Sequence, residues 1–215
     1  MKFYWIKTRR IIKKIFSNYI WDVSNTEDGT TIYLTFDDGP IPEITEWVLK
    51  ELKKYHVKAT FFCIGDNIDK NPEIFKKVIS DGHSIGNHTF NHLNGWKTAS
   101  DVFIENTKLC EESIQKNSCY KLRSTIFRPP YGKIKASQSI KIRKLGYKII
   151  MWDILSADFD PTISQEQCLE NVLSNLRPGS IIVFHDSTKA FKNLEYVLPK
   201  TLAYLRENNF NCGVL

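Results

Sequence analysis

Long apolar runs are missing from this sequence. No stretch approaches the roughly 20 consecutive apolar residues that a transmembrane helix needs, and five basic residues between positions 7 and 14 break up the apolar core that a signal peptide requires. No small-residue cleavage site follows them. We therefore expect neither a membrane-spanning helix nor a signal peptide, and a location that is cytoplasmic or peripheral to a membrane.

Cysteine pairs are missing as well. The five cysteines are odd in number and include no C-x-x-C spacing, so neither a zinc–cysteine site nor a disulfide framework is indicated. Cys63 lies inside an apolar run and is expected to be a small buried hydrophobe. Internal repeats and low-complexity linkers are also absent, and 215 residues suit a single domain with a sizeable core.

Excess charge is absent from the body of the chain. The sequence has 30 basic residues and 24 acids, and six of the basic residues but no acid lie within residues 1–20, which leaves 24 of each sign in the rest. A neutral body argues against a nucleic-acid partner. We expect residues 1–24 to form a short basic N-terminal arm and residues 25–215 to form the domain.

The arm contains an amphipathic stretch. Ile12, Ile15, Phe16 and Tyr19 recur at helical spacing, with lysines between them. Two interpretations stay open. In the one we favour, this apolar face packs on the domain and leaves the lysines solvated. In the other, residues 1–20 make a peripheral contact with an anionic membrane.

Apolar strands alternate with amphipathic helices along the domain. We expect strands at 31–35, 58–64, 83–87, 125–128, 147–152, 180–184 and 210–215. The expected helices are 43–54, 72–80, 98–116, 137–145, 164–176 and 194–207. This alternation indicates an α/β fold with a parallel sheet and crossover helices. It fits either a closed or distorted (β/α) barrel or an open doubly wound sheet.

Polar side chains follow the strands where each strand ends. They are Asp37, Asp38, His88, Arg128, Asp153, Asp158, His185 and Asp186. Because the C-terminal ends of parallel strands meet at one edge, we expect these side chains to share one mouth. His83 precedes its strand and is expected to be structural, while His56 is expected to be a solvated surface residue.

One subset of these residues has the composition of a metal site. His88 and His92 are four residues apart and are predicted to share the face of one helical turn. Asp38 offers a third ligand, and two histidines with one carboxylate leave open positions on Zn²⁺ or a similar divalent ion. On these motifs alone, a polar turn at Asp37–Asp38 and a pair of surface histidines remain open.

Taken together, the motifs resemble those of the NodB-like polysaccharide deacetylases, which are metal-dependent carbohydrate N- or O-deacetylases. The matching motifs, in the order of the family, are TFDDGP at 35–40, HTFNH at 88–92, RPPYG at 128–132 and HD at 185–186. The resemblance implies a distorted (β/α)₇ barrel. One motif departs from the family's Asp-x-x-Asp-Trp, because Leu155 and Phe159 stand in place of the first acid and the tryptophan. This departure bears on substrate contacts more than on the core chemistry.

The resemblance also implies roles for the site residues. The metal ligands would be Asp38, His88 and His92, with Zn²⁺ favoured as the divalent ion. The residues with implied catalytic roles are Asp37 as general base, Arg128 as the group that holds Asp37, Tyr131 as a backbone N–H donor to the oxyanion, His185 as general acid, and Asp158 as its partner. Trp152 and Phe159 are candidates for stacking on a sugar ring, with core packing as the alternative.

The expected function is therefore a hydrolase that removes acetyl groups from N-acetylated sugars of a poly- or oligosaccharide. Two alternatives stay open: an O-acetyl carbohydrate esterase that uses the same site, and a catalytically silent glycan-binding protein on this scaffold. In each case the expected partner is an acetylated carbohydrate.

Overall fold

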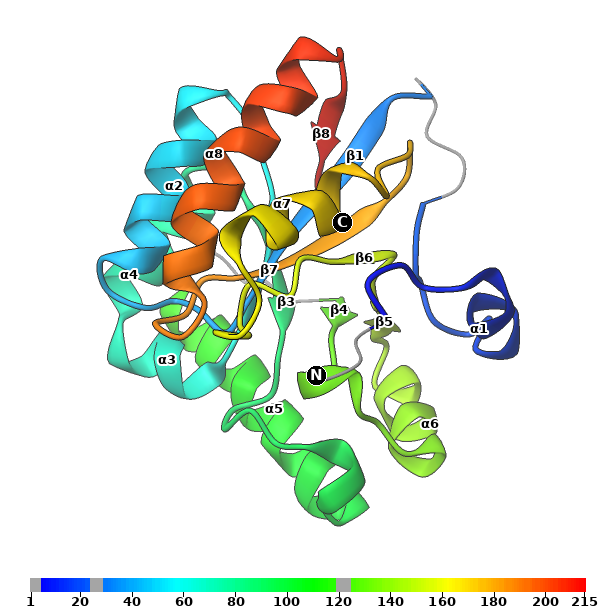
Figure 1. The fold of residues 1–215 in the computed structure, drawn as a ribbon. Helices are drawn as coiled ribbons and strands as arrows, with labels where there is room; N and C mark the ends of the chain where they lie inside the picture. Colours follow the sequence, from blue (N-terminus) through cyan, green and yellow to red (C-terminus); the bar gives the residue numbers. More distant parts are fainter. Residues whose placement is uncertain (1–4, 24–28, 119–124) are drawn as a thin grey trace.

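The computed structural model describes residues 5–23, 29–118 and 125–215 (Figure 1). The strands are β1 Thr31–Asp37, β2 Thr60–Cys63, β3 Ser84–Asn87, β4 Ile126–Phe127, β5 Lys148–Ile149, β6 Ile154–Leu155, β7 Ile181–His185 and β8 Asn211–Gly213. The α-helices are α1 Arg10–Ile15, α2 Ile44–Lys54, α3 Gly65–Lys70, α4 Pro72–Ser80, α5 Ser100–Asn117, α6 Ala136–Lys144, α7 Gln165–Leu173 and α8 Phe191–Glu207. Every strand and domain helix that we predicted is confirmed.

The sheet order decides between the two expected architectures. Neighbouring strands run β5-β4-β3-β2-β1-β7-β6, with β8 beside the start of β1, and the pairings are parallel. Consecutive strands are therefore neighbours around the sheet, as in a barrel, whereas a doubly wound sheet reverses its order at a switch point. The fold is a distorted (β/α)₇ barrel that is open between β5 and β6, and the prediction of this barrel is confirmed.

Two short elements were not predicted. Helix α3 carries a single buried large apolar residue, Ile68, in an otherwise polar sequence, so it lacks an amphipathic period. Strand β6 is only two residues long, which is too short for any alternation to be visible. Helix α2 begins at Ile44, one residue later than the expected start at residue 43.

The register of the central strands sets which side chains enter the barrel. Phe36 of β1 is level with Phe61 of β2 and Phe184 of β7, and its ring stacks on theirs at centroid distances of 5.0 and 5.8 Å. These rings pack in the core that α2 and α8 also line. Because side chains alternate along a strand, Thr35 and Asp37 point to the opposite face, into the barrel.

The N-terminal arm bridges the opening of the barrel. Ile20 pairs in parallel with Ile150, next to β5, and Lys7 pairs antiparallel with Ile154 of β6. The N–H of Leu155 donates to the carbonyl of Ile6 at 2.9 Å. Backbone groups at the two open edges thus find partners in the arm, and this removes most of the cost of leaving them unpaired.

A buried carboxylate anchors the arm. Asp153 is fully buried and forms ion pairs with Lys7, Lys13 and Arg177, and it accepts a hydrogen bond from Ser180 at 2.7 Å. Burial by itself would raise the pKa of Asp153, but the bonds from its cationic neighbours outweigh burial and lower it. The expectation that Asp153 faces the active-site mouth is wrong, because it precedes β6 and lies at the N-terminal end of that strand.

The packing of the arm differs from the interpretation that we favoured. Lys13 is largely buried in its ion pairs, so the prediction that the lysines are solvated is wrong for this residue. Ile12 and Tyr19 are half-buried, whereas Ile15 and Phe16 are 65% and 46% exposed. The packed face is therefore only partly apolar. The boundary that we expected at residues 24–25 lies outside the described residues.

The described residues bear on two features that the sequence analysis considered, membrane-spanning helices and paired cysteines. Within them no helix combines the length and the apolar character that crossing a membrane would require. Their cysteines are free thiols, and Cys63, Cys110 and Cys168 are buried, which confirms Cys63 as a small core residue. Cys119 lies outside the described residues.

Replacing Asp153 with alanine tests the anchor. The substitution leaves three cations facing a buried space without their common partner, and breaking a buried ion pair in this way costs about 3 kcal/mol. For a chain of this size we expect the melting temperature to fall by roughly 6–12 °C. Asp66→Ala is the control, because its pair with Lys70 is exposed and contributes under about 1 kcal/mol. Equal shifts in the two variants, measured by thermal unfolding, would contradict the anchoring role.

Candidate active site

The candidate residues meet at the C-terminal ends of the strands. Asp37 ends β1 and lies level with His185, the last residue of β7. His88 follows β3 and Arg128 follows β4. The structure brings these side chains together at one mouth, as expected. Asp37 contacts Arg128 and His88, and His185 lies level with Asp37 on the neighbouring strand.

Asp38, His88 and His92 form a compact set of donor atoms. Asp38 Oδ1 lies 3.3 Å from His92 Nε2 and 3.9 Å from His88 Nε2, and the three atoms fall within 4.8 Å of one another. Asp38 Oδ1 is buried and has no hydrogen-bond donor among the described residues. A buried, unpartnered carboxylate oxygen beside two imidazole nitrogens suits a divalent cation, so the residues fit the metal that the resemblance implies.

The two histidines come together through a loop. Residues 88–92 are not helical, and Thr89 and His92 have φ angles of 65° and 55°. The prediction of one helical turn is therefore wrong, although the two rings do lie 5.1 Å apart. Asn106 of α5 holds the loop by accepting hydrogen bonds from the N–H groups of Phe90 and Asn91, both at 2.9 Å.

Protein contacts leave both imidazoles ready to bind a cation. His88 Nδ1 donates to the carbonyl of Arg128 at 2.7 Å, which leaves the lone pair on Nε2 facing the site. Burial lowers the pKa of His88. Burial and the charge of the neighbouring His88 both lower the pKa of His92, to about 4. Both rings are therefore neutral at pH 7, as a metal ligand must be.

Asp37 is held by Arg128 inside the barrel. The guanidinium is fully buried and donates through Nη1 to Asp37 Oδ1 and to Thr35 Oγ1, each at 2.7 Å. Burial would raise the pKa of Asp37, but the charge of Arg128 beside it outweighs burial and lowers the pKa. Asp37 is thus a fixed carboxylate, with its Oδ2 4.0 Å from His88 Nε2.

Asp186 shapes the turn that carries Asp38. It accepts a hydrogen bond from the Gly39 N–H at 3.0 Å and another from the Thr45 hydroxyl at 2.6 Å. A Cβ at Gly39 would lie only 2.0 Å from the Asp186 carboxylate, so this turn requires glycine. Asp38 itself has a φ of 88°, and its carbonyl accepts from Asn67 Nδ2 at 2.7 Å. Asp186 therefore stabilises the turn at Asp38 and Gly39 through these hydrogen bonds.

Tyr131 presents a backbone N–H near the donor set of Asp38, His88 and His92. Its φ is 60°, and its ring packs on His92 at a centroid distance of 4.5 Å. Its N–H has no acceptor among the described residues, whereas the Gly132 N–H donates to the carbonyl of Pro129 at 2.9 Å. Of the two neighbouring amides in this motif, only that of Tyr131 is available to a ligand.

His185 and Asp158 form a bidentate pair. Asp158 is fully buried, and it accepts from His185 Nδ1 through Oδ1 and from the His185 backbone N–H through Oδ2, both at 2.8 Å. Burial would lower the pKa of His185, but the Asp158 carboxylate outweighs burial and raises the pKa to about 9. The imidazole is therefore protonated at neutral pH.

The residues that depart from the family pattern lie beside this pair. Phe159 packs edge-on against the His185 ring at a centroid distance of 4.9 Å and is only partly buried. Leu155 is 7% exposed within the sheet, so it is a core side chain. Trp152 is partly buried between two apolar clusters and packs over Gly132, which favours core packing. Phe159 is thus the better placed of the two aromatic candidates for a sugar ring.

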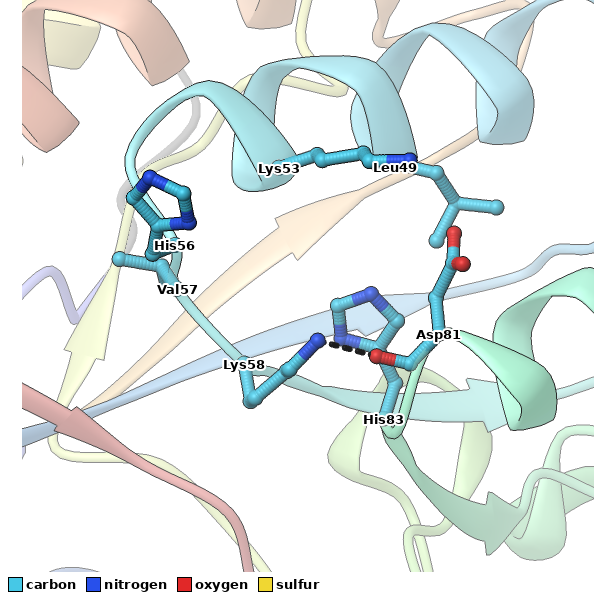
Figure 2. Close-up of a pocket in the computed structure, with 7 residues that line it drawn as sticks. All are labelled: Leu49, Lys53, His56, Val57, Lys58, Asp81 and His83. Carbon is cyan, nitrogen blue, oxygen red and sulfur yellow. Dashed lines mark hydrogen bonds between the residues drawn. The ribbon is translucent and has the colours of Figure 1, made fainter.

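A cavity lies at the opposite end of the strands from the candidate site. It has a volume of about 220 Å³ and is lined by Leu49, Lys53, His56, Val57, Lys58, Asp81 and His83 (Figure 2). Lys58 donates to the carbonyl of Asp81, and His83 Nδ1 accepts from the Ala59 N–H at 3.1 Å. Burial lowers the pKa of His83 to about 4. His83 is structural, as predicted, and this cavity is separate from the candidate site.

Several positioning residues had no signal in the sequence. Three asparagines each form a hydrogen bond with a backbone carbonyl or amide of a site segment: Asn67, Asn106 and Asn193, the last of which bonds the carbonyl of Asp158. Asparagine is common on protein surfaces, and none of these three belongs to the motifs that follow the strands. Asn87 is the exception: it precedes His88 at the end of a strand and accepts from the Thr89 N–H at 3.0 Å.

The geometry agrees with comparisons to known proteins. A family model described as polysaccharide deacetylase matches residues 24–150. A peptidoglycan-N-acetylglucosamine deacetylase of Bacillus cereus is 36% identical over 169 residues, which are 79% of this chain and 60% of that protein. A chitooligosaccharide deacetylase of Azorhizobium caulinodans is 36% identical over 165 residues, 75% of this chain and 76% of that protein.

A solved structure is similar over almost the whole chain. The crystal structure of the Bc1960 peptidoglycan N-acetylglucosamine deacetylase matches with a TM-score of 0.85 at 30% identity, covering 97% of this chain and 95% of that one. The chain spans less than two thirds of the Bacillus cereus relative's length but nearly all of this structure. From the family match and these identities, the chain belongs to the polysaccharide deacetylase family.

Proposed function

We propose that this chain is a metal-dependent hydrolase that removes acetyl groups from N-acetylated sugars of a poly- or oligosaccharide. The observation that carries the proposal is the pairing of two sets of residues at one mouth. Asp38, His88 and His92 suit a divalent cation, and the same mouth holds a fixed carboxylate, Asp37, and a protonated imidazole, His185. Amide hydrolysis needs these three functions together.

The metal would be held by Asp38, His88 and His92. Two imidazoles and one carboxylate form the donor set of many catalytic zinc sites, so we propose Zn²⁺ as the ion. A divalent cation at this site would supply Lewis acidity toward an acetyl carbonyl and toward a water molecule. The hydrogen bond from His88 Nδ1 to the Arg128 carbonyl orients the ring for this role.

Asp37 is proposed as the general base. Its carboxylate is ionised and oriented by Arg128, which engages Oδ1 and leaves Oδ2 toward the His88 side of the site. There it can accept the proton of an attacking water. The Tyr131 N–H, which has no acceptor within the described part of the chain, can donate to the carbonyl oxygen as negative charge develops on it.

His185 is proposed as the general acid. Asp158 occupies Nδ1, so Nε2 is the nitrogen that can deliver a proton to the leaving group. An amine must be protonated to leave, whereas an alkoxide-type leaving group depends on protonation less. An imidazole that Asp158 keeps charged therefore favours the N-acetyl substrate over the O-acetyl one.

The substrate proposal is tested by acetate release. We expect the chain to release acetate from N-acetylated chitooligosaccharides or peptidoglycan fragments, to lose this activity with a chelator and to regain it with added Zn²⁺. Paired O-acetylated sugars run in parallel separate the two chemistries. Faster release from the O-acetylated set would make the chain an esterase, and glycan binding without acetate release under any divalent metal would make it a binding protein.

Measuring the metal bound by variants of Asp38 and His92 tests the proposed ligand set. Asp38→Ala and His92→Ala each remove one of three donors, so we expect zinc content after dialysis to fall well below one equivalent, with weaker binding by at least tenfold. His56→Asn is the matched control, because His56 lies at the other end of the strands. Full zinc occupancy in either ligand variant, measured by elemental analysis, would refute the assignment.

The pH dependence of turnover tests the acid. His185 must carry its proton, so kcat should fall as the pH rises through about 9, the pKa that Asp158 sustains. In Asp158→Asn burial is opposed only by the smaller effects of Asp38 and Asp37 on the pKa of His185, so the alkaline limb should move down toward pH 6.5, the ordinary histidine value. Asp160→Asn changes a buried neighbouring carboxylate that bonds Thr162, and it should keep the limb in place. An unshifted limb in Asp158→Asn would contradict the acid role.

A further inference from the structure

The outer surface of the arm places apolar and basic side chains in adjacent rows. On α1, Ile11 and Ile15 are one helical turn apart and are 63% and 65% exposed. Arg10 and Lys14 form the next row and are exposed as well. Phe16 directly follows the helix and is 46% exposed. We call these five residues the arm face.

The arm face is held outward by the barrel. The ion pairs of Lys7 and Lys13 with Asp153 and the pairing of Ile20 with Ile150 fix the opposite side of the arm. Figure 1 shows α1 at the edge of the molecule, away from α2, α4 and α8. Exposure of the arm face is therefore a consequence of how the arm is anchored, and the arm cannot rotate its apolar row inward without breaking these contacts.

The charges around the arm face indicate the kind of partner. Lys7 and Lys13 are neutralised by acids of the domain, but Arg9, Arg10 and Lys14 form no ion pair with any described residue. The remainder of the sequence beyond residue 20 balances 24 basic residues with 24 acids. Three cations without an ion pair to any described residue thus lie beside the exposed isoleucines, within the segment that carries the net positive charge of the sequence.

A lipid surface matches this combination better than a second apolar protein face. Contact with an apolar protein face would bury the isoleucines but leave three cations without partners. An anionic bilayer offers acyl chains to the apolar row and phosphate groups to the basic row at the same time. We propose that the arm face docks on an anionic lipid bilayer and holds the domain at the membrane surface.

Vesicle binding of the full chain tests this proposal. We expect co-sedimentation with vesicles of phosphatidylcholine and phosphatidylglycerol, and much weaker binding to phosphatidylcholine alone. Each basic side chain near an anionic surface contributes about fivefold (~1 kcal/mol), so R10Q/K14Q should weaken binding by about 25-fold. I11S/I15S should weaken it by at least about tenfold, because two apolar side chains no longer enter the bilayer.

Matched substitutions elsewhere separate the arm face from general basicity. Ile140 and Lys144 are exposed one turn apart on α6, so I140S/K144Q changes the same residue types and should leave vesicle binding unchanged. Melting temperatures of all variants should stay within a few degrees of the parent. Acetate release from a soluble oligosaccharide should be the same in each, which keeps this test independent of the proposed function.

Three outcomes would overturn the proposal. They are equal binding to the two kinds of vesicle, equal binding by the arm-face variants and the parent, and a dimer in solution that I11S/I15S converts to monomer. The last result would assign the arm face to a second copy of the chain.

Discussion

The pair between Arg128 and Asp37 is the contact on which the site depends. A guanidinium with no exposed surface must satisfy its donors within the barrel, and Arg128 does so with Asp37, Thr35 and the carbonyls of Ile150 and Met151. These groups come from two parts of the barrel, strand β1 and the segment that follows β5. The same residue's own carbonyl fixes the His88 ring. One buried cation thus positions the proposed base and, through its backbone, one proposed metal ligand.

Backbone strain is concentrated around this contact. Of eight non-glycine residues with positive φ in the described chain, Asp38, Thr89, His92, Tyr131 and Ala157 lie in or next to site segments. Such conformations cost of order 1–3 kcal/mol each and persist only where surrounding bonds impose them. Asp186, Asn67, Asn87 and Asn106 supply those bonds. Because of this strain, donor atoms point inward to the site, whereas at a relaxed strand end they would point apart.

Much of the fold was predictable from the sequence, because its signals are local. Apolar runs such as Ile181–Phe184 and helix patterns such as that of α2 depend on side-chain periodicity. The alternation of strands with helices predicts a parallel sheet, but it leaves the order of the strands open. The mouth residues that end a strand or directly follow one were predictable for the same reason, namely Asp37, Asp38, His88, Arg128 and His185. The conformation of 88–92 was not, because a helical turn and the observed loop have the same i, i+4 histidine spacing.

Asp153 and Asp158 show why position along a strand decides the function of an acid. Both lie near the two-residue strand β6, and in the sequence both looked like acids at a strand end. The structure places Asp153 before β6, where it gathers Lys7, Lys13 and Arg177, and Asp158 after it, where it holds His185. Because β6 is too short to be seen in the sequence, its two ends could not be told apart. The acid at one end ties the arm across the opening of the barrel, and the acid at the other sustains the charge of the proposed general acid.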